Sequence, residues 1–243
     1  MARYPEKPED IYKDITADYK EVFGEDLVSM VLYGSAAGGD YRPGRSDVNF
    51  LIVLTEAGIE SLDRAFKTVE RWRKRYVAVP LFVTETYVQS SLDVFPIEYL
   101  DMQRRHVTVY GPDVLEGLSF DSEHVRLQCE REIKGKLLLL REGYLETGGK
   151  ARGLKELIAQ SLPAFAAIFK ALLYLQGKEI PARKPDVFKR GAKGLGLDAG
   201  VFEALASVRE ERSKPNEERL NRLVKDYLRE VRKLAVIADS QGG

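Results

Sequence analysis

The residues best suited to chemistry lie in one short stretch, from Val31 to Leu54, which reads VLYGSAAGGDYRPGRSDVNFLIVL. An apolar run ends at Gly34-Ser35, a glycine-rich loop follows, and Asp47 and Asn49 introduce a second apolar run. Because side chains alternate along a strand, Asp47 and Asn49 are predicted to share one face. Glycine lets the backbone approach a ligand closely, and serine adds a hydroxyl and an amide N–H. This layout is typical of a site that holds a phosphate beside a metal ion.

The same stretch resembles the minimal signature of the nucleotidyltransferase superfamily, which includes DNA polymerase beta and the aminoglycoside nucleotidyltransferases. That signature is a Gly-Ser turn, a variable loop and an Asp-x-Asp pair on a strand. Gly34-Ser35 and Asp47-x-Asn49 take these places here. The resemblance implies transfer of a nucleoside monophosphate from a nucleoside triphosphate (NTP) to a small-molecule hydroxyl. It also implies Mg²⁺ or Mn²⁺, held by the Asp-x-Asp pair and an acid on a later strand.

The second acidic position departs from the signature, because it is Asn49 instead of aspartate. A carboxamide offers a metal ion a neutral carbonyl oxygen and brings no negative charge. Two divalent ions close together repel each other, and bridging carboxylates make that arrangement tolerable. The sequence therefore predicts a weak metal site or none, and a weakly active or degenerate transferase. The alternative is a non-catalytic member of the fold that binds a nucleotide or a protein partner, in an antitoxin-like or regulatory role.

The third acid is predicted in the segment FPIEYLDM, where the resemblance to aminoglycoside-type relatives favours Glu98 on a strand. Alternation along that strand puts Glu98 and Asp101 on opposite faces, so only one of them can face the site. Asp101 and Glu85 are the alternatives, as is a site with no third acid.

The predicted site therefore consists of two groups of residues. Asp47, Asn49 and Glu98 are the candidate catalytic and metal-binding residues. The candidate nucleotide-binding residues are the turn and two loop arginines that could reach a triphosphate: Gly34, Ser35, Arg42 and Arg45.

The elements that must position these residues follow from the spacing of apolar side chains. Helical spacing marks 10–23 and 61–72, and short apolar runs predict strands at 27–33, 50–54, 77–83, 95–102 and 106–110. From Ser122 onward the pattern is almost entirely helical, with a kink or break at Pro163 and a proline-rich link at 180–185. The sequence thus predicts an α+β protein. Its parts are a nucleotidyltransferase-like mixed sheet with helices on one side (1–118) and an all-α helical bundle (122–239).

Composition narrows the partners and the compartment. Lysine plus arginine equals aspartate plus glutamate at 38 each, so no overall field favours nucleic acid or an anionic membrane. The single cysteine, Cys129, excludes an internal disulfide, and we expect it at a buried helix position. The N-terminal residues show no signal-peptide pattern, and purely apolar runs are too short for a membrane span. We therefore expect a cytoplasmic protein that binds a nucleotide and an unidentified small-molecule acceptor, with a homodimer as a further possibility.

Overall fold

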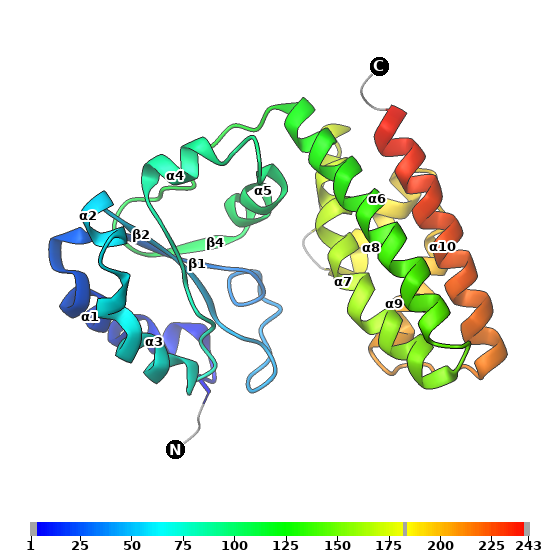
Figure 1. Cartoon of the computed structure of the whole chain (residues 1–243), viewed down its shortest axis with the longest axis horizontal. Helices are drawn as coiled ribbons and strands as arrows, with labels where there is room; N and C mark the ends of the chain where they lie inside the picture. The colour runs from blue at the N-terminus through cyan, green and yellow to red at the C-terminus, as the bar shows by residue number, and fades with distance from the viewer. Residues whose placement is uncertain (1–3, 182–183, 241–243) are drawn as a thin grey trace. The chain divides into compact units, whose positions relative to one another are not determined.

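The computed structural model describes residues 4–181 and 184–240 (Figure 1). The chain forms two compact units, one of Met1–Asp93 with Tyr99–Ser119 and the other of Val94–Glu98 with Phe120–Gly243. Helix α5 (Pro96–Arg104) therefore contributes its first residues to unit 2 and the rest to unit 1. Separate domains at 1–118 and 122–239 stay a prediction.

Unit 1 contains a four-stranded mixed sheet in the order β3-β2-β1-β4. Strand β1 (Leu27–Tyr33) pairs antiparallel with β2 (Asn49–Leu54) and with β4 (His106–Tyr110), and β2 pairs parallel with β3 (Leu81–Val83). The predicted strands at 27–33 and 106–110 are confirmed, and β2 begins one residue before its predicted start. The α+β class is thus confirmed.

Short helices surround this sheet. The segment before β1 forms a 3₁₀ turn, then α1, then a second 3₁₀ turn: Pro8–Ile11, Tyr12–Phe23 and Gly24–Asp26. The helical elements after β2 are α2 (Glu56–Ile59), a 3₁₀ turn (Leu62–Ala65), α3 (Phe66–Arg73) and, beyond β3, α4 (Glu85–Ser90). The predicted helices at 10–23 and 61–72 therefore each begin as a 3₁₀ turn.

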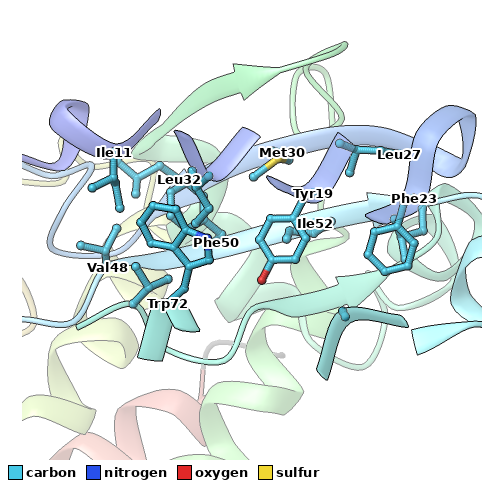
Figure 2. Close-up of a cluster of buried hydrophobic side chains, with 14 residues drawn as sticks. Ile11, Tyr19, Phe23, Leu27, Met30, Leu32, Val48, Phe50, Ile52 and Trp72 are labelled. Atoms are coloured by element: carbon cyan, nitrogen blue, oxygen red, sulfur yellow. The ribbon is translucent and has the colours of Figure 1, made fainter. Parts of the chain in front are cut away.

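One face of the sheet packs against α1 and α3 to form the core of unit 1 (Figure 2). Ile15, Tyr19 and Phe23 recur at helical spacing along α1, and Phe50 and Ile52 alternate along β2 toward the same cluster. The chain's single tryptophan, Trp72 in α3, is 2% exposed, and its Nε1 donates a hydrogen bond to Asp18 of α1 at 2.8 Å. Trp72 therefore reports on the packing of unit 1.

The opposite face of the sheet is buried as well. Val31, Leu51 and Val53 alternate with the core residues and are each at most 1% exposed. Figure 1 shows α1 and α3 on one side of the strands and α4 on the other. Unbroken apolar runs such as FLIVL indicate a strand buried on both faces. The sequence predicted helices on one side of the sheet, whereas in the structure helices lie on both sides.

Two predicted strands differ from the structure. The segment 95–102 is not a strand but the beginning of α5, so the prediction for it was wrong. Pro96 suits the first position of a helix, and Ile97 and Leu100, both buried, have helical spacing. Of the predicted strand 77–83 only Leu81–Val83 forms a strand, and Val77 makes a single bridge to Val48.

The described residues of unit 2 after Phe120 form helices and their connections. These helices are α6 (Ser122–Glu146), α7 (Ala151–Leu175), α8 (Lys184–Gly194), α9 (Ala199–Arg209) and α10 (Glu217–Ser240). Pro163 lies inside α7 without ending it, and residues 182–183 of the predicted link lie outside the described residues. Phe169, Phe202 and Tyr227 join α7, α9 and α10 through edge-to-face ring contacts.

In the described ranges, α7 alone is long and apolar enough to cross a membrane by length and composition. Of its most apolar window, 56% is buried inside the protein, as in the core helix of a bundle. The expectation of no membrane is consistent with this burial, and the cytoplasmic location stays a prediction.

The end of β4 lies very close to β1 at Gly111. Gly111 has a φ of +74°, and a Cβ there would stand 2.1 Å from the carbonyl oxygen of Val28. The hydroxyl of Ser29, which is fully buried, lies 3.1 Å and 2.8 Å from the carbonyl oxygens of Tyr110 and Pro112. A side chain at position 111 would therefore separate two paired strands.

We expect Gly111→Ala to destabilise unit 1 more than Gly117→Ala, which is the matched control. Gly117 has a similar φ of +73° but no atom within 4 Å of an added Cβ. The control should lower the free energy of unfolding by about 1–2 kcal/mol, and Gly111→Ala by about 1–3 kcal/mol more. Urea titration followed by Trp72 fluorescence measures both values, and equal losses would contradict the close contact.

Candidate functional site

The candidate site begins where β1 ends, at a turn that starts with Gly34. Gly34 has a φ of +76°, in the left-handed region that favours glycine. Its carbonyl oxygen accepts a hydrogen bond from the N–H of Gly38 at 3.0 Å, and that of Ser35 accepts one from Asp40 at 3.1 Å. The chain thus coils through a single turn directly after the strand.

This turn leaves backbone donors available to a ligand. Across the described ranges, no protein group accepts a hydrogen bond from the N–H of Ser35, Ala36 or Ala37. Ala36 and Ala37 pack against the core of unit 1, which holds the backbone in place. Successive unpaired N–H groups in a turn are an anion-binding arrangement. The turn is therefore suited to a phosphate group.

Asn49 lies directly beside this turn. It pairs with Tyr33, the residue before Gly34, and its Nδ2 would stand 3.3 Å from a Cβ added to Gly34. The same Nδ2 donates to the backbone carbonyl oxygen of Asp47 at 3.4 Å. Asp47 is exposed at the start of β2. The structure thus brings the glycine turn and Asn49 together, with Asp47 two residues away.

The strands on either side offer no further carboxylate at this level. On β3's side, Ala78, Val79 and Pro80 fall between the Val48–Val77 bridge and the Leu51–Leu81 pair, and Val79 is 57% exposed. On the other side Tyr33 pairs with His106 of β4. The three paired residues across β2, β1 and β4 next to the turn are therefore Asn49, Tyr33 and His106, which carry a carboxamide, a phenol and an imidazole.

Glu98 lies on a helix and not on the predicted strand. It lies in the first turn of α5 and is part of unit 2, whereas Asp47 is part of unit 1. Its carboxylate accepts a hydrogen bond from Gln128 Nε2 at 2.7 Å, and Gln128 Oε1 accepts one from the N–H of Ile97 at 2.8 Å. Glu98 thus helps to fasten α5 to α6, and its role as the third acid stays a prediction.

The thiol of Cys129 lies near the same contact. Cys129 is buried in α6, as predicted from its apolar neighbours. Burial, followed by the charges of Glu132 and Glu98, raises the pKa of its thiol to about 12. Cys129 is therefore a protonated core residue rather than a nucleophile.

The two predicted loop arginines are exposed. Arg42 and Arg45 lie in a turn closed by Ser46, whose N–H donates to the carbonyl oxygen of Arg42 at 2.9 Å. Tyr41 anchors the loop by donating its hydroxyl to the carbonyl oxygen of Pro5 at 2.8 Å. In the described part of the chain, no hydrogen bond or ion pair joins either arginine to the Gly34–Ser35 turn. Their part in binding a triphosphate stays a prediction.

One residue next to the turn was missed from the sequence. Arg105 lies between α5 and β4, and its Nη1 would stand 2.9 Å from a Cβ added to Gly38. A single arginine in the run RRH carries no signal of its own. Only the pairing of β4 with β1 places Arg105 at the turn.

His106 follows Arg105 and forms a pair with Asp113. Its Nε2 lies 2.7 Å from Asp113 Oδ2, and its Nδ1 lies 3.0 Å from the carbonyl oxygen of Gln103. Burial raises the pKa of Asp113, but the bonds from His106, Leu115 and Glu116 outweigh burial and lower it overall. The pair fixes the beginning of β4 beside the turn.

The predicted transfer chemistry needs side chains that can hold a metal ion. Over residues 4–181 and 184–240, no three His, Cys, Asp or Glu side chains gather closely enough to do so. A hollow of about 500 Å³ lies at α8 and α9, with Phe188 and Phe202 among its lining residues. None of the predicted site residues lines it.

Comparison with models of known protein families and with curated proteins finds no match for this chain.

We expect Asp113→Asn to destabilise unit 1 in a pH-dependent way. Because folding lowers its pKa, the Asp113 carboxylate stabilises the fold above the unfolded-state value, about 3.9. This contribution is lost as the pH falls through the folded-state pKa. The difference in free energy of unfolding between wild type and Asp113→Asn should thus be larger at about pH 6 than at about pH 3.

Urea titrations followed by Trp72 fluorescence at both pH values provide the measurement. Asp63→Asn removes an exposed carboxylate from the same unit and controls for the loss of charge. A difference between wild type and Asp113→Asn that is the same at both pH values would count against the lowered pKa.

Proposed function

We propose that this protein binds a nucleoside triphosphate at the Gly34–Ser35 turn, as a nucleotidyltransferase-like protein whose metal-dependent transfer is weak or lost. The observation that carries the proposal is the turn itself. The N–H groups of Ser35, Ala36 and Ala37 have no partner within the described residues, and Asn49 lies beside them. Backbone donors of this kind suit the oxygens of a phosphate group.

The residues at the turn do not fit a pair of divalent cations. Asp47 lies two residues before β2, Asn49 contributes no charge, and the Asp40 carboxylate is paired with Arg105. Between the Val48–Val77 bridge and β3 the chain carries Ala78, Val79 and Pro80, which have no carboxylate. Since repulsion between two divalent ions needs bridging anionic ligands, this donor set supports binding better than transfer.

Transfer to a small-molecule hydroxyl is the second candidate function. The observation that favours it is Asp47, which is exposed and which alternation puts on the same face of β2 as Asn49. An active enzyme would release pyrophosphate from the triphosphate in the presence of an acceptor hydroxyl. A protein that only binds the nucleotide would not.

We expect wild-type protein to bind ATP or another NTP in calorimetric titration, and Gly34→Ala to weaken this binding. The added methyl group would be strained at a φ of +76° and would meet Asn49 at 3.3 Å. Repositioning the turn should weaken NTP binding about tenfold or more, equivalent to about 1.4 kcal/mol.

Gly39→Ala is the matched control for this experiment. Gly39 lies in the same loop with a φ of +75°, but an added Cβ meets no atom within 4 Å. Gly39→Ala should bind NTP nearly as well as wild type. Equal weakening by both variants would indicate general damage to the loop, and no binding by wild type would refute the proposal.

We expect Asn49→Asp to create a stronger response to divalent metal. In chelator the new carboxylate would face the Asp47 carbonyl oxygen that Asn49 Nδ2 now contacts, so the melting temperature should fall. Mn²⁺ should then raise the melting temperature of Asn49→Asp more than that of wild type, because a second anionic ligand joins Asp47.

Asn49→Ser provides the control, since it removes the amide without adding charge. Equal Mn²⁺ shifts in Asn49→Asp and wild type would end the metal-site interpretation. Pyrophosphate release measured on the same samples separates the two candidate functions, because only a transferase should gain turnover with Asn49→Asp.

A further inference from the structure

The pairing of β4 with β1 places a cation at the glycine turn. Tyr33, at the end of β1, pairs antiparallel with His106. Because the two strands run in opposite directions, the residue after Tyr33, which is Gly34, lies across from the residue before His106, which is Arg105. A Cβ on Gly38 would stand 2.9 Å from Arg105 Nη1 and 3.3 Å from its Cδ. The Arg105 side chain therefore lies against the turn at position 38, where an added methyl group would push the guanidinium aside.

The guanidinium of Arg105 is only partly paired by the protein. Its Nη1 lies 3.8 Å from Asp40 Oδ2, which is an ion pair but too long for a hydrogen bond. Its Nη2 is buried and, within the part of the chain that the structure describes, has no hydrogen-bond partner. The side chain as a whole is 19% exposed, so Arg105 is not sealed in the core of unit 1.

A buried, unpaired guanidinium N–H is unfavourable unless something accepts from it. The planar fork of arginine matches two oxygens of a phosphate group, and such charge-assisted bonds are among the stronger ones in proteins. Asp40 is itself 34% exposed and sits at the end of the same turn, whose Ser35 carbonyl accepts from its N–H. An arriving polyphosphate would compete with Asp40 for Arg105.

We propose that Arg105 binds the polyphosphate of the nucleotide, with Asp40 as the carboxylate that this polyphosphate displaces. The inference rests on the proposed function, and it names the charged side chain that this site would otherwise lack. The turn supplies neutral N–H donors, and Arg105 supplies the positive charge. The ligand class is therefore a compound that carries phosphate groups rather than a nucleoside.

A purely structural role for Arg105 makes a different prediction. If the Arg105–Asp40 pair only held the loop in shape, removing either partner would weaken ligand binding. If Arg105 binds the polyphosphate, removing Asp40 frees the guanidinium and removes a nearby negative charge, so binding becomes tighter. The sign of the Asp40→Asn effect therefore separates the two roles.

The experiment is calorimetric titration of the full chain with ATP and with inorganic triphosphate, in chelator and with Mg²⁺. Arg105→Gln should weaken binding of both compounds about tenfold or more. Arg105→Lys should fall between Arg105→Gln and wild type, because it keeps the charge but not the fork. Asp40→Asn should tighten binding. Arg104→Gln, which removes an exposed neighbouring charge, should leave it unchanged.

Urea titration followed by Trp72 fluorescence shows which variants keep unit 1 folded. If Arg105→Gln is unfolded, binding by Arg105→Lys and Asp40→Asn decides the result. Unchanged binding by Arg105→Gln, or weaker binding by Asp40→Asn, overturns the inference for Arg105. The proposed function survives either outcome if Gly34→Ala still weakens ATP binding. No binding of ATP by the wild type overturns both.

Discussion

The antiparallel pairing of β1 with β2 is the constraint on which the rest of unit 1 depends. Its register joins Leu32 to Phe50 on the core face and Tyr33 to Asn49 at the end. A shift of one residue would turn every core side chain of β2 to the opposite face. Burial on both faces therefore holds the glycine turn and the start of β2 side by side. The site is where this ladder stops and the chain must turn.

Charge is the second determinant of what this site can do. A nucleotidyl-transfer site concentrates carboxylates to hold divalent ions. Here Asn49 stands beside the turn, and Arg105 lies against it. Asp40, which forms an ion pair with Arg105, and Asp47 are the carboxylates near the turn. The carboxamide of Asn49 and the guanidinium of Arg105 are the two features that support the proposed anionic ligand over a pair of divalent cations.

Helix α5 shows how tertiary contacts decide local structure. The segment FPIEYLDM has enough apolar and aromatic residues to suit a strand, and alternation along that strand predicts Glu98 and Asp101 on opposite faces. The structure instead begins a helix at Pro96, and Gln128 of α6 accepts from the N–H of Ile97 and donates to Glu98. Short apolar runs are ambiguous between strand and helix, and a partner distant in sequence resolves the ambiguity.

The sequence by itself determined the strands at 27–33 and 106–110, the helical second half, the buried cysteine and the break at Gly34-Ser35 after the first strand. Each of these follows from a local signal, such as an unbroken apolar run, helical spacing or a Gly-Ser break between strands. Only the tertiary structure decided that Glu98 begins a helix in unit 2 and that Arg105 lies at the turn. The reason is that Arg105 is separated from Gly34 by most of unit 1 in sequence, and strand pairing alone brings them together. A lone arginine has no periodicity, so its role is set by the register of β4 against β1.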